Sequence, residues 1–376
     1  MAIAISIWAL RIAALGIIFL SALPFLPVGA WWVRICDFPR VQLLGLLMLV
    51  LLITCILRCF STWQTLDTAW LIIIGLTGLW QISFILPYTK VWSEEVPGIT
   101  EIPAENPSFR IVVANLEIGN EEKSAVVEKL NELDPDILLT IETDQPWMDE
   151  LKNLDPELKL HSHVVRDEGL GMALWTRLEV IEEEIKHLVS ERRASFFTTF
   201  SIPAGKFNFV GLHPTPPGLK DSTDDERRDS RVRDAELMLI AKQVADKQQD
   251  SWIVTGDFND VAWSHTTRLF KRTSGLKDPR IGRQMLNTYH AEYPLLRYPI
   301  DHVFVSKGFH LESLDRVRIP GSDHFAVIAD LVFIAEAGTD PEPEGNDEED
   351  SKEMIKEGID DAQEKGVAAP EAGSTD

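Results

Sequence analysis

Three long apolar stretches occupy the first ninety residues of this 376-residue chain, over residues 3–23, 41–57 and 69–86. Each is about 17–21 residues long, close to the ~20 that a helix needs to cross a ~30 Å hydrocarbon layer. Trp31 and Trp63 lie near proposed ends of these stretches, as in the aromatic belts of membrane proteins. We therefore predict that residues 1–90 form three transmembrane helices that anchor the chain in a lipid bilayer.

The first stretch has one alternative interpretation, a cleaved signal peptide. It lacks a basic region at its start, Arg11 lies within it, and two further spans follow, so a retained helix is favoured. Three spans place the N-terminus and the rest of the chain on opposite sides of the membrane. Arg34 and Arg40 in the first loop, against Arg58 in the second, weakly favour a cytoplasmic first loop and a cytoplasmic C-terminal region.

Charge divides the chain into three unlike parts. Residues 1–90 have a net charge of +3, residues 91–335 of −14 and residues 336–376 of −12, within a total of −23. The composition predicts a membrane region, a linker over 91–108, an acidic folded domain over 109–334 and an acidic tail over 335–376. Pro, Gly and acids dominate the tail, so we expect it to be disordered, with a short helix possible around 351–365.

Three polar motifs in the C-terminal part each adjoin an apolar run that is typical of a β-strand. Strand ends that carry Asp, Asn and His are suited to hold a hard divalent cation beside a phosphate. Three such clusters in one domain indicate an enzyme. The motifs are Gly256-Asp257-Phe258-Asn259, Ile300-Asp301-His302 and Ser322-Asp323-His324.

Three further strand ends upstream carry groups of the same kind. Residues 109–114 lead into Asn115 and Glu117, residues 136–141 end at Glu142, and His213 follows a third apolar run. Glu142 is the best candidate metal ligand, because a charge at the end of a buried strand is costly unless a cation compensates it. Asn115 and Glu117 share a side-chain direction on an extended backbone, so Glu117 is a second candidate.

The ordered series of these blocks resembles the endonuclease/exonuclease/phosphatase superfamily, which has the DNase-I-like fold. The resemblance covers about residues 109–334, and its strength lies in the order and spacing of the whole set. It implies an α/β (α+β) domain, a four-layer α/β/β/α sandwich of two packed mixed sheets, here preceded by three transmembrane helices. The series is Asn115, Glu142, His213, Asp257 with Asn259, Asp301, and Ser322-Asp323-His324.

The alternation of patterns along the domain agrees with this architecture. Amphipathic helices are predicted over 121–133 and 224–248, the second with Leu237, Ile240 and Val244 on one face. Further strands are predicted over 171–176, 195–202 and 206–212. Paired strands with few helices between them favour two packed sheets over a doubly wound parallel sheet.

The resemblance also implies roles for the residues. Asn115, Glu142, Asp323 and secondarily Glu117 would hold Mg²⁺ or Mn²⁺. Asp257 would activate the attacking water or approach the metal, and Asn259 would orient the nucleophile or the phosphate. Asp301 would hold His324 as an imidazolium facing the scissile phosphate. His213 would be a second phosphate contact or a general acid, and His302 is ambiguous between a site role and a structural one.

The sequence therefore predicts a membrane-anchored, Mg²⁺-dependent phosphoesterase, a multi-pass protein of a bacterial inner or plasma membrane. Its substrate, a phosphodiester, a phosphomonoester or a lipid-linked phosphate, would lie near the bilayer. A metal-dependent DNA nuclease is the alternative. It is disfavoured because acidic domains repel nucleic acid, although Arg227, Arg228, Arg231 and Arg233 form a local basic cluster. A binding module that has lost catalysis is a third possibility, which predicts losses among the motifs, and none is lost.

Overall fold

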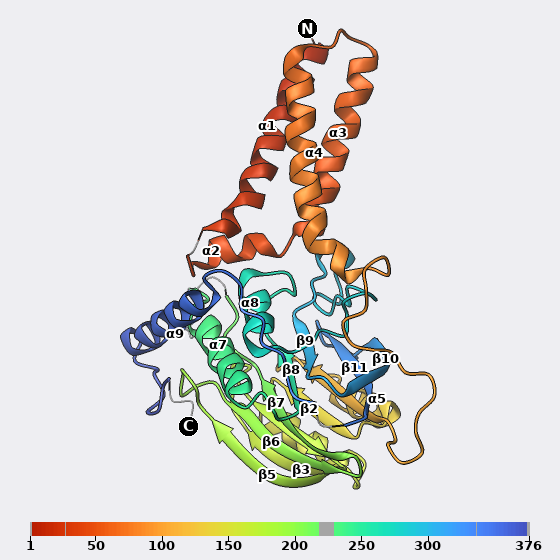
Figure 1. Cartoon of the computed structure of the whole chain (residues 1–376), viewed down its shortest axis with the longest axis vertical. Coiled ribbons are helices and arrows are strands. Elements are labelled where there is room, and N and C mark those ends of the chain that lie inside the picture. The colour runs from red at the N-terminus through yellow and green to blue at the C-terminus, as the bar shows by residue number, and fades with distance from the viewer. Residues whose placement is uncertain (1, 27, 218–228, 336, 374–376) are drawn as a thin grey trace.

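The structure is a computed structural model that describes residues 2–26, 28–217, 229–335 and 337–373. A bundle of three long helices stands on a larger α/β unit (Figure 1). Its segments Ile3–Phe25, Arg40–Cys59 and Thr65–Tyr88 are long and apolar enough to cross a membrane. The bundle helices are α1 (Ala2–Ala22), α3 (Arg40–Cys59) and α4 (Thr65–Ile85), with the short α2 (Trp31–Arg34) between α1 and α3.

The bundle buries a small cluster of charges between its helices. Arg11 of α1 and Arg58 of α3 donate hydrogen bonds to the same oxygen of Asp67 in α4, at 2.6 and 2.7 Å. Asp67 is almost completely buried. Each charge therefore has its counter-charge within the bundle, as burial in a medium of low dielectric constant requires.

The α/β unit contains two sheets, and the first has six strands in the order β10-β11-β1-β2-β4-β3. β1 and β2 are parallel, and the other neighbours are antiparallel, so this sheet is mixed. Its strands are β1 (Phe109–Asn115), β2 (Ile137–Ile141), β3 (Lys159–Val164), β4 (Met172–Thr176), β10 (Phe309–Arg318) and β11 (Phe325–Phe333).

The second sheet has five strands in the order β5-β6-β7-β8-β9. β7 and β8 are parallel, and the other neighbours are antiparallel. Its strands are β5 (Glu179–Lys186), β6 (Ser195–Ile202), β7 (Gly205–Leu212), β8 (Trp252–Asp257) and β9 (Asp301–Val305).

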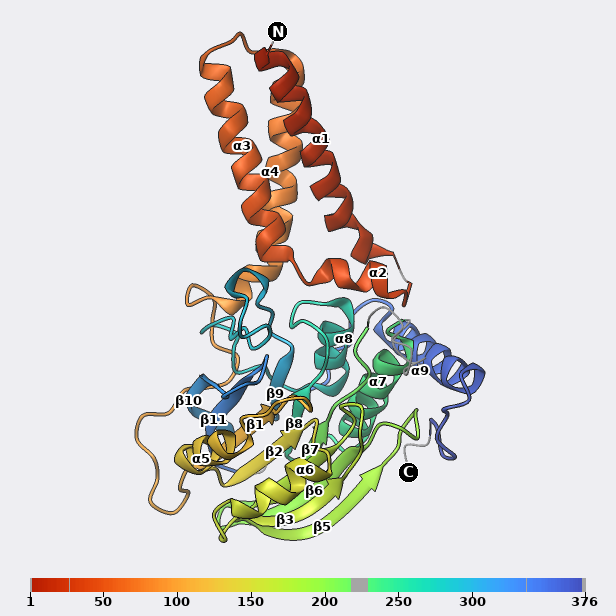
Figure 2. The ribbon, with the colours of Figure 1, turned by 180° about the vertical axis from the view of Figure 1, so that it is seen from behind.

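The two sheets pack face to face around an aromatic core that includes Phe109, Phe196 and Phe207. Helices cover the outer face of each sheet, as Figure 2 shows from behind. The prediction of a four-layer sandwich is therefore confirmed. The first sheet is covered by α5 (Lys123–Leu133) and α6 (Gln145–Glu150), and the second by α7 (Arg231–Asp246) and α8 (His265–Ser274). The predicted helix over 224–248 corresponds to α7, and its residues 224–228 lie outside the described residues.

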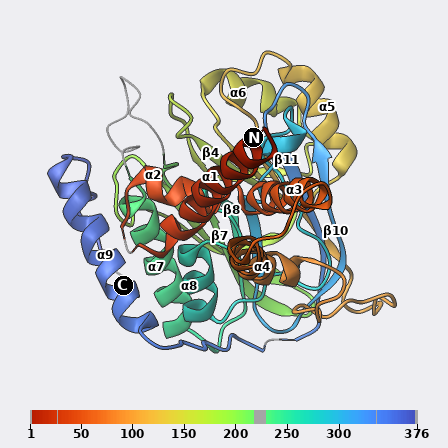
Figure 3. The same ribbon diagram turned by 90° about the horizontal axis from the view of Figure 1, so that it is seen from above.

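The acidic C-terminal segment differs from the expectation of a disordered tail. Residues Asp347–Glu364 form α9, which packs along α7 at the periphery of the domain (Figure 3). Gly358 allows this close approach, since a Cβ there would lie 2.3 Å from the Cβ of Ala235. Arg231 pairs with Asp361, and Arg272 with Asp347, so basic groups of the domain compensate the helix acids. The short helix considered possible around 351–365 is thus present as α9, and the structure shows this part of the tail as ordered.

Candidate active site

The strand topology brings all the predicted motifs to one edge of the sandwich. β1 and β2 run parallel, so Asn115 and Glu142 lie at the same edge of the first sheet. β11 runs antiparallel to β1, which places His324, just before its start, at that edge. In the second sheet Asp257 at the end of β8 pairs directly with Asp301 at the start of β9. Chain segments far apart in sequence therefore meet in one site.

Three of these polar residues have left-handed backbone conformations. The φ angles are 59° at Glu117, 64° at Glu142 and 52° at Asn259. Such angles are uncommon outside glycine. Each residue follows a strand end, where the chain turns and directs the side chain toward the edge of the sandwich. Backbone strain of this kind concentrates at functional sites because it fixes the direction of a reacting group.

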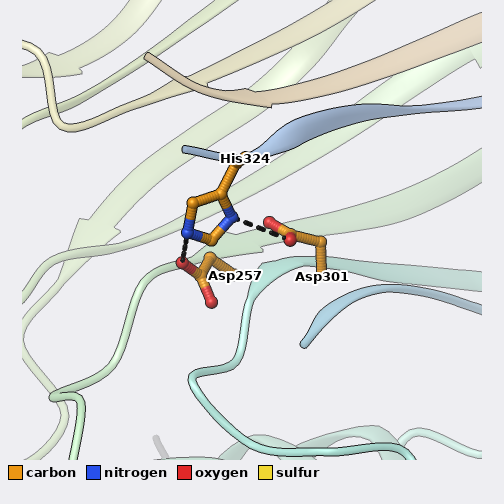
Figure 4. Close-up of side chains that lie close together, drawn as sticks. All are labelled: Asp257, Asp301 and His324. Carbon is orange, nitrogen blue, oxygen red and sulfur yellow. Dashed lines mark hydrogen bonds and ion pairs between the residues drawn. The ribbon is translucent and has the colours of Figure 1, made fainter. Parts of the chain in front are cut away.

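An imidazole lies between two buried carboxylates at the centre of the site (Figure 4). His324 Nδ1 is 3.0 Å from Asp301 Oδ2, and His324 Nε2 is 3.7 Å from Asp257 Oδ2. Burial lowers the pKa of His324, but Asp301 and Asp257 outweigh this effect and raise that pKa to about 10. Burial and the charge of Asp301 raise the pKa of Asp257 to about 7. The predicted dyad of Asp301 and His324 is present, with Asp257 as a third member.

The ligand atoms of Asp257, Asp301 and His324 all lie within 4.8 Å of one another, a separation compatible with a metal ion. The hydrogen-bonded ion pair between His324 and Asp301 already explains this closeness. Moreover, two carboxylates that stabilise an imidazolium favour a proton on the ring, and a protonated ring nitrogen cannot bind a metal. The arrangement of these three residues is therefore better suited to holding and moving a proton than to binding a metal ion.

A second acidic group lies beside the first. Asn115 Nδ2 donates to Glu142 Oε1 at 3.0 Å and to Asp257 Oδ2 at 3.2 Å. The backbone N–H of Ile118 donates to the other oxygen of Glu142, and that of Asp323 to Glu117 Oε2. Asn115 thus bridges the two acidic groups and fixes the orientation of both carboxylates.

The acidic group of Glu117, Glu142 and Asp323 fits a hard divalent cation. Within the described residues, none of the three forms an ion pair with a lysine or arginine. Burial, then Asp323 and Glu142, raise the pKa of Glu117, because these like charges repel one another. Carboxylate and amide oxygens are the ligands that Mg²⁺ takes in proteins, and a cation would relieve the repulsion.

The remaining predicted residues line the same site. His213 Nε2 lies 3.9 Å from Asp257 Oδ2, and the His213 side chain is buried. Asn259 Nδ2 donates to the carbonyl of Pro214 at 3.0 Å, which joins the turn after β8 to the turn after β7. Every residue that the sequence singled out for the site is therefore placed at this edge.

The site opens into a cavity of about 610 Å³. Its residues Tyr289 and Arg193 are among those that were not anticipated from the sequence. Tyr289 packs its ring on that of His324, with the ring centroids 4.9 Å apart, and burial and the nearby acids raise its pKa to about 12. Arg193 is a buried arginine in the cavity wall. Neither lies at the end of a predicted strand. The polar lining comprises Glu142, Glu168, Arg193, His213, Asp257, Asn259, Tyr289, Asp323 and His324.

His302, which the sequence left ambiguous, is structural. Its ring is buried among the aromatic rings of Phe258 and Phe304. Nδ1 accepts a hydrogen bond from Arg280, and Nε2 donates to the carbonyl of Asp260 at 2.8 Å. Burial and the charge of Arg280 lower the pKa of His302 well below its usual value. The adjacent Asp301 faces the site, so the ring occupies the opposite side of the strand.

The sequence profile of the endonuclease/exonuclease/phosphatase family matches residues 112–324, more than half of the chain. The chain belongs to this family. The matched region begins in β1 and ends at His324, so it contains both carboxylate groups and the histidine at the centre of the site. No curated protein sequence matches the chain.

Solved structures similar to this chain include members of the same family. An endonuclease/exonuclease/phosphatase family protein from Bacteroides thetaiotaomicron is 20% identical, with a TM-score of 0.47 over 61% of this chain and 98% of its own. The mannosyl-6-phosphatase of the same species is 22% identical, with a TM-score of 0.47 over 60% and 100%. TDP2 from D. rerio, solved with a single-stranded DNA product, is 15% identical, with a TM-score of 0.48 over 60% and 98%.

Proposed function

We propose that this protein is a membrane-anchored, divalent-cation-dependent hydrolase of phosphate esters. One observation carries the proposal. A group of acids that form no ion pair with a lysine or arginine of the described residues lies beside a carboxylate–imidazole pair, and Asn115 joins the two across 3.0 and 3.2 Å. Hydrolysis of a phosphate ester needs positive charge on the phosphate oxygens and a base for the attacking water, and this arrangement provides a place for each.

Glu142, Asp323 and Glu117, with Asn115, would hold the cation. When bound, Mg²⁺ or Mn²⁺ supplies positive charge that offsets the charge on the phosphate oxygens. Glu142 is held for this role through both of its carboxylate oxygens, which accept from Asn115 and Ile118. The left-handed backbone at Glu142 keeps its side chain in place.

The remaining residues would move protons and orient the substrate. A pKa of about 7 suits Asp257 as the general base that takes a proton from water near neutral pH. His324, held as an imidazolium by Asp301, would donate a hydrogen bond to the phosphate. Asn259 follows Asp257 by two residues and would orient the attacking water or a phosphate oxygen, while His213 would contact the phosphate from the second sheet.

A DNA nuclease is the alternative and is less well supported. Its strongest sequence feature was the arginine cluster at 227–233, of which residues 229–233 are described. Arg231 pairs with Asp229 and Asp361, and Arg233 is fully buried against Asp234 and Asp260. These two arginines therefore do not present free positive charge to a nucleic-acid backbone.

We propose that α1, α3 and α4 anchor this enzyme as a multi-pass membrane protein. A direct test uses the purified full chain in phosphatidylcholine nanodiscs with p-nitrophenyl phosphate, bis(p-nitrophenyl) phosphate and duplex DNA. We expect hydrolysis of a small phosphate ester with Mg²⁺ or Mn²⁺ that stops on addition of EDTA. Full activity in excess EDTA would contradict the proposed function, and much faster cleavage of DNA would favour the nuclease.

A further inference from the structure

The cavity at the site has two chemically different walls. The sandwich contributes the acids and histidines described above. The opposite wall is apolar and comes from the membrane region, through Leu20 at the end of α1 and through Ile35, Cys36, Phe38 and Pro39 before α3. A cavity that is charged on one side and apolar on the other is suited to a molecule that has a charged part and an apolar part.

The apolar wall lies at the level of the membrane surface. Leu20 is within the candidate span Ile3–Phe25, and residues 35–39 immediately precede the span Arg40–Cys59. Leu20 is 42% exposed and Ile35 is 44% exposed. These side chains are therefore accessible to a molecule bound in the cavity.

Specific contacts fix the domain against this part of the bundle. Trp263 Nε1 donates to the carbonyl of Asp37 at 2.8 Å, and the ring of Phe38 packs edge-on against Tyr298, with the centroids 5.4 Å apart. The hydroxyl of Tyr88, at the end of the third candidate span, donates to the carbonyl of Ala262 at 2.8 Å. Both the segment before α3 and the turn after α4 are thus attached to the domain, and the cavity faces the helix bundle.

A loop of the domain reaches the start of α3 beside the cavity. Tyr293, Leu295 and Leu296 are exposed, Leu295 by 83%. Gln42, in the first turn of α3, donates to the carbonyl of Leu295 at 2.8 Å, which places this apolar tip at the start of a candidate span. The same loop returns to the site, where the N–H of Ala291 donates to the carbonyl of Asp323 at 2.6 Å. An exposed apolar tip at this level is stabilised by the headgroup and acyl boundary of the membrane.

We propose that the substrate is a phosphate ester carried on an apolar chain and taken from the bilayer, an inference that rests on the proposed function. The phosphate lies against the acids and histidines, and the first part of the chain lies along Leu20, Ile35 and Phe38. A water-soluble sugar phosphate or a nucleic acid would leave this wall uncovered, whereas an acyl or prenyl chain covers it and gains from burial.

The test measures binding, so that it does not depend on turnover. The full chain in phosphatidylcholine nanodiscs with Mg²⁺ is titrated by calorimetry with n-alkylphosphonates from ethyl to octyl. Each methylene buried on the apolar wall should tighten binding by about fourfold. Leu20→Gln and Ile35→Gln should flatten this dependence on chain length. Phe19→Gln should retain it, because Phe19 is the neighbouring residue, is 62% exposed, and does not line the cavity.

Alkylphosphonates also partition into the lipid of the nanodisc, to the same extent with both variants. Comparison of Leu20→Gln with Phe19→Gln therefore removes this contribution to the measured affinity. Affinity that is independent of chain length, or an equal dependence in Leu20→Gln and Phe19→Gln, would overturn the inference. Hydrolysis of bis(p-nitrophenyl) phosphate and p-nitrophenyl phosphate is measured in the same preparations. If hydrolysis depends on the cation but affinity for the alkylphosphonates does not change with chain length, only the lipid substrate is rejected. If affinity rises with chain length but neither phosphate ester is hydrolysed, the proposed function is rejected.

Discussion

Two acidic sites in this molecule, one buried and one half-buried, differ in how their charge is balanced. In the helix bundle, Asp67 accepts hydrogen bonds from both Arg11 and Arg58. At the candidate active site, Glu117 and Glu142 accept hydrogen bonds only from amide groups in the described part of the chain, and neither they nor Asp323 pair there with a lysine or arginine. The first site is complete as folded. In the second, burial and like charges raise the pKa of Glu117, and under the proposed function a bound cation would supply the counter-charge.

This difference separates a structural acid from a functional one. Burying an acid costs free energy unless its charge is compensated. Asp67 receives that compensation within the bundle, so its removal should affect stability more than chemistry. The cavity acids are held at a cost to the cation-free fold, so their removal should affect chemistry more than stability. The predictions below follow from this contrast, from the largest expected effect to the smallest.

The largest effect is expected from the carboxylate–imidazole pair next to the cavity acids. Asp301→Asn and His324→Ala should each lower the rate of phosphate-ester hydrolysis by roughly 10²–10⁴. Because the two residues act through one hydrogen bond, the double variant should be little slower than either single variant. Steady-state kinetics of all four proteins would show this, and fully multiplicative losses would mean that the residues act separately.

Replacement of the structural acid should have the largest effect on stability. Asp67→Asn leaves Arg11 and Arg58 buried without their partner, and should lower the free energy of unfolding by roughly 3–5 kcal/mol. The exposed pair of Lys152 and Asp149 offers a control, since solvent screens this ion pair and Asp149→Asn should leave stability nearly unchanged. Denaturant titration in detergent, followed by tryptophan fluorescence, compares the two variants. Equal stability of the two would contradict the assignment of Asp67.

A smaller effect is expected at the amide that joins the two acidic groups. Asn115→Ala removes donors to Glu142 and Asp257 and leaves their carboxylates less well oriented. Such changes around a metal ligand cost about 10- to 100-fold in cation affinity or activity. The Mg²⁺ concentration that gives half-maximal activity should rise accordingly. Asn131→Ala, at an exposed site on α5, should leave it unchanged.

The smallest effect concerns the dependence of stability on pH without cations. The pKa of Glu117 is raised in the folded protein, so its contribution to stability is fully present below its ordinary pKa. That contribution is lost as pH rises through the raised value. In EDTA, the difference in melting temperature between Glu117→Gln and the unaltered protein should therefore grow as pH rises. Saturating Mg²⁺ should abolish or reverse that difference. A difference that is constant across pH would argue against the repulsion among these acids.

The sequence predicted the sandwich and the polar edge well, for a physical reason. The strands that carry the site residues are buried apolar runs. A polar residue directly after such a run is easily recognised in the sequence, as at Thr255-Gly256-Asp257 and Ile141-Glu142. β5 was not predicted, because it is an exposed strand at the edge of its sheet. Its consecutive Glu182, Glu183 and Glu184 do not show the alternation of apolar and polar residues that marks a strand.

Other features arise only when distant segments meet. The high charge of α9 favoured disorder, and its stabilisation comes from Arg231 and Arg272, more than seventy positions away in the chain. Tyr289 and Arg193 have no local pattern that marks them as site residues. Likewise, Leu20 belongs to an apolar run in which every residue is suited to a membrane span, and only the folded arrangement places it in the wall of the cavity.

The central claim is that Glu117, Glu142 and Asp323 bind a divalent cation, and calorimetric titration of Mg²⁺ into the full chain tests it most directly. In phosphatidylcholine nanodiscs, the unaltered protein and Glu132→Gln, at an exposed site on α5, should show the same saturable binding. Glu142→Gln should lose it while keeping its melting temperature in EDTA. Saturable binding of equal strength in Glu142→Gln, or its absence from the unaltered protein, would contradict the account.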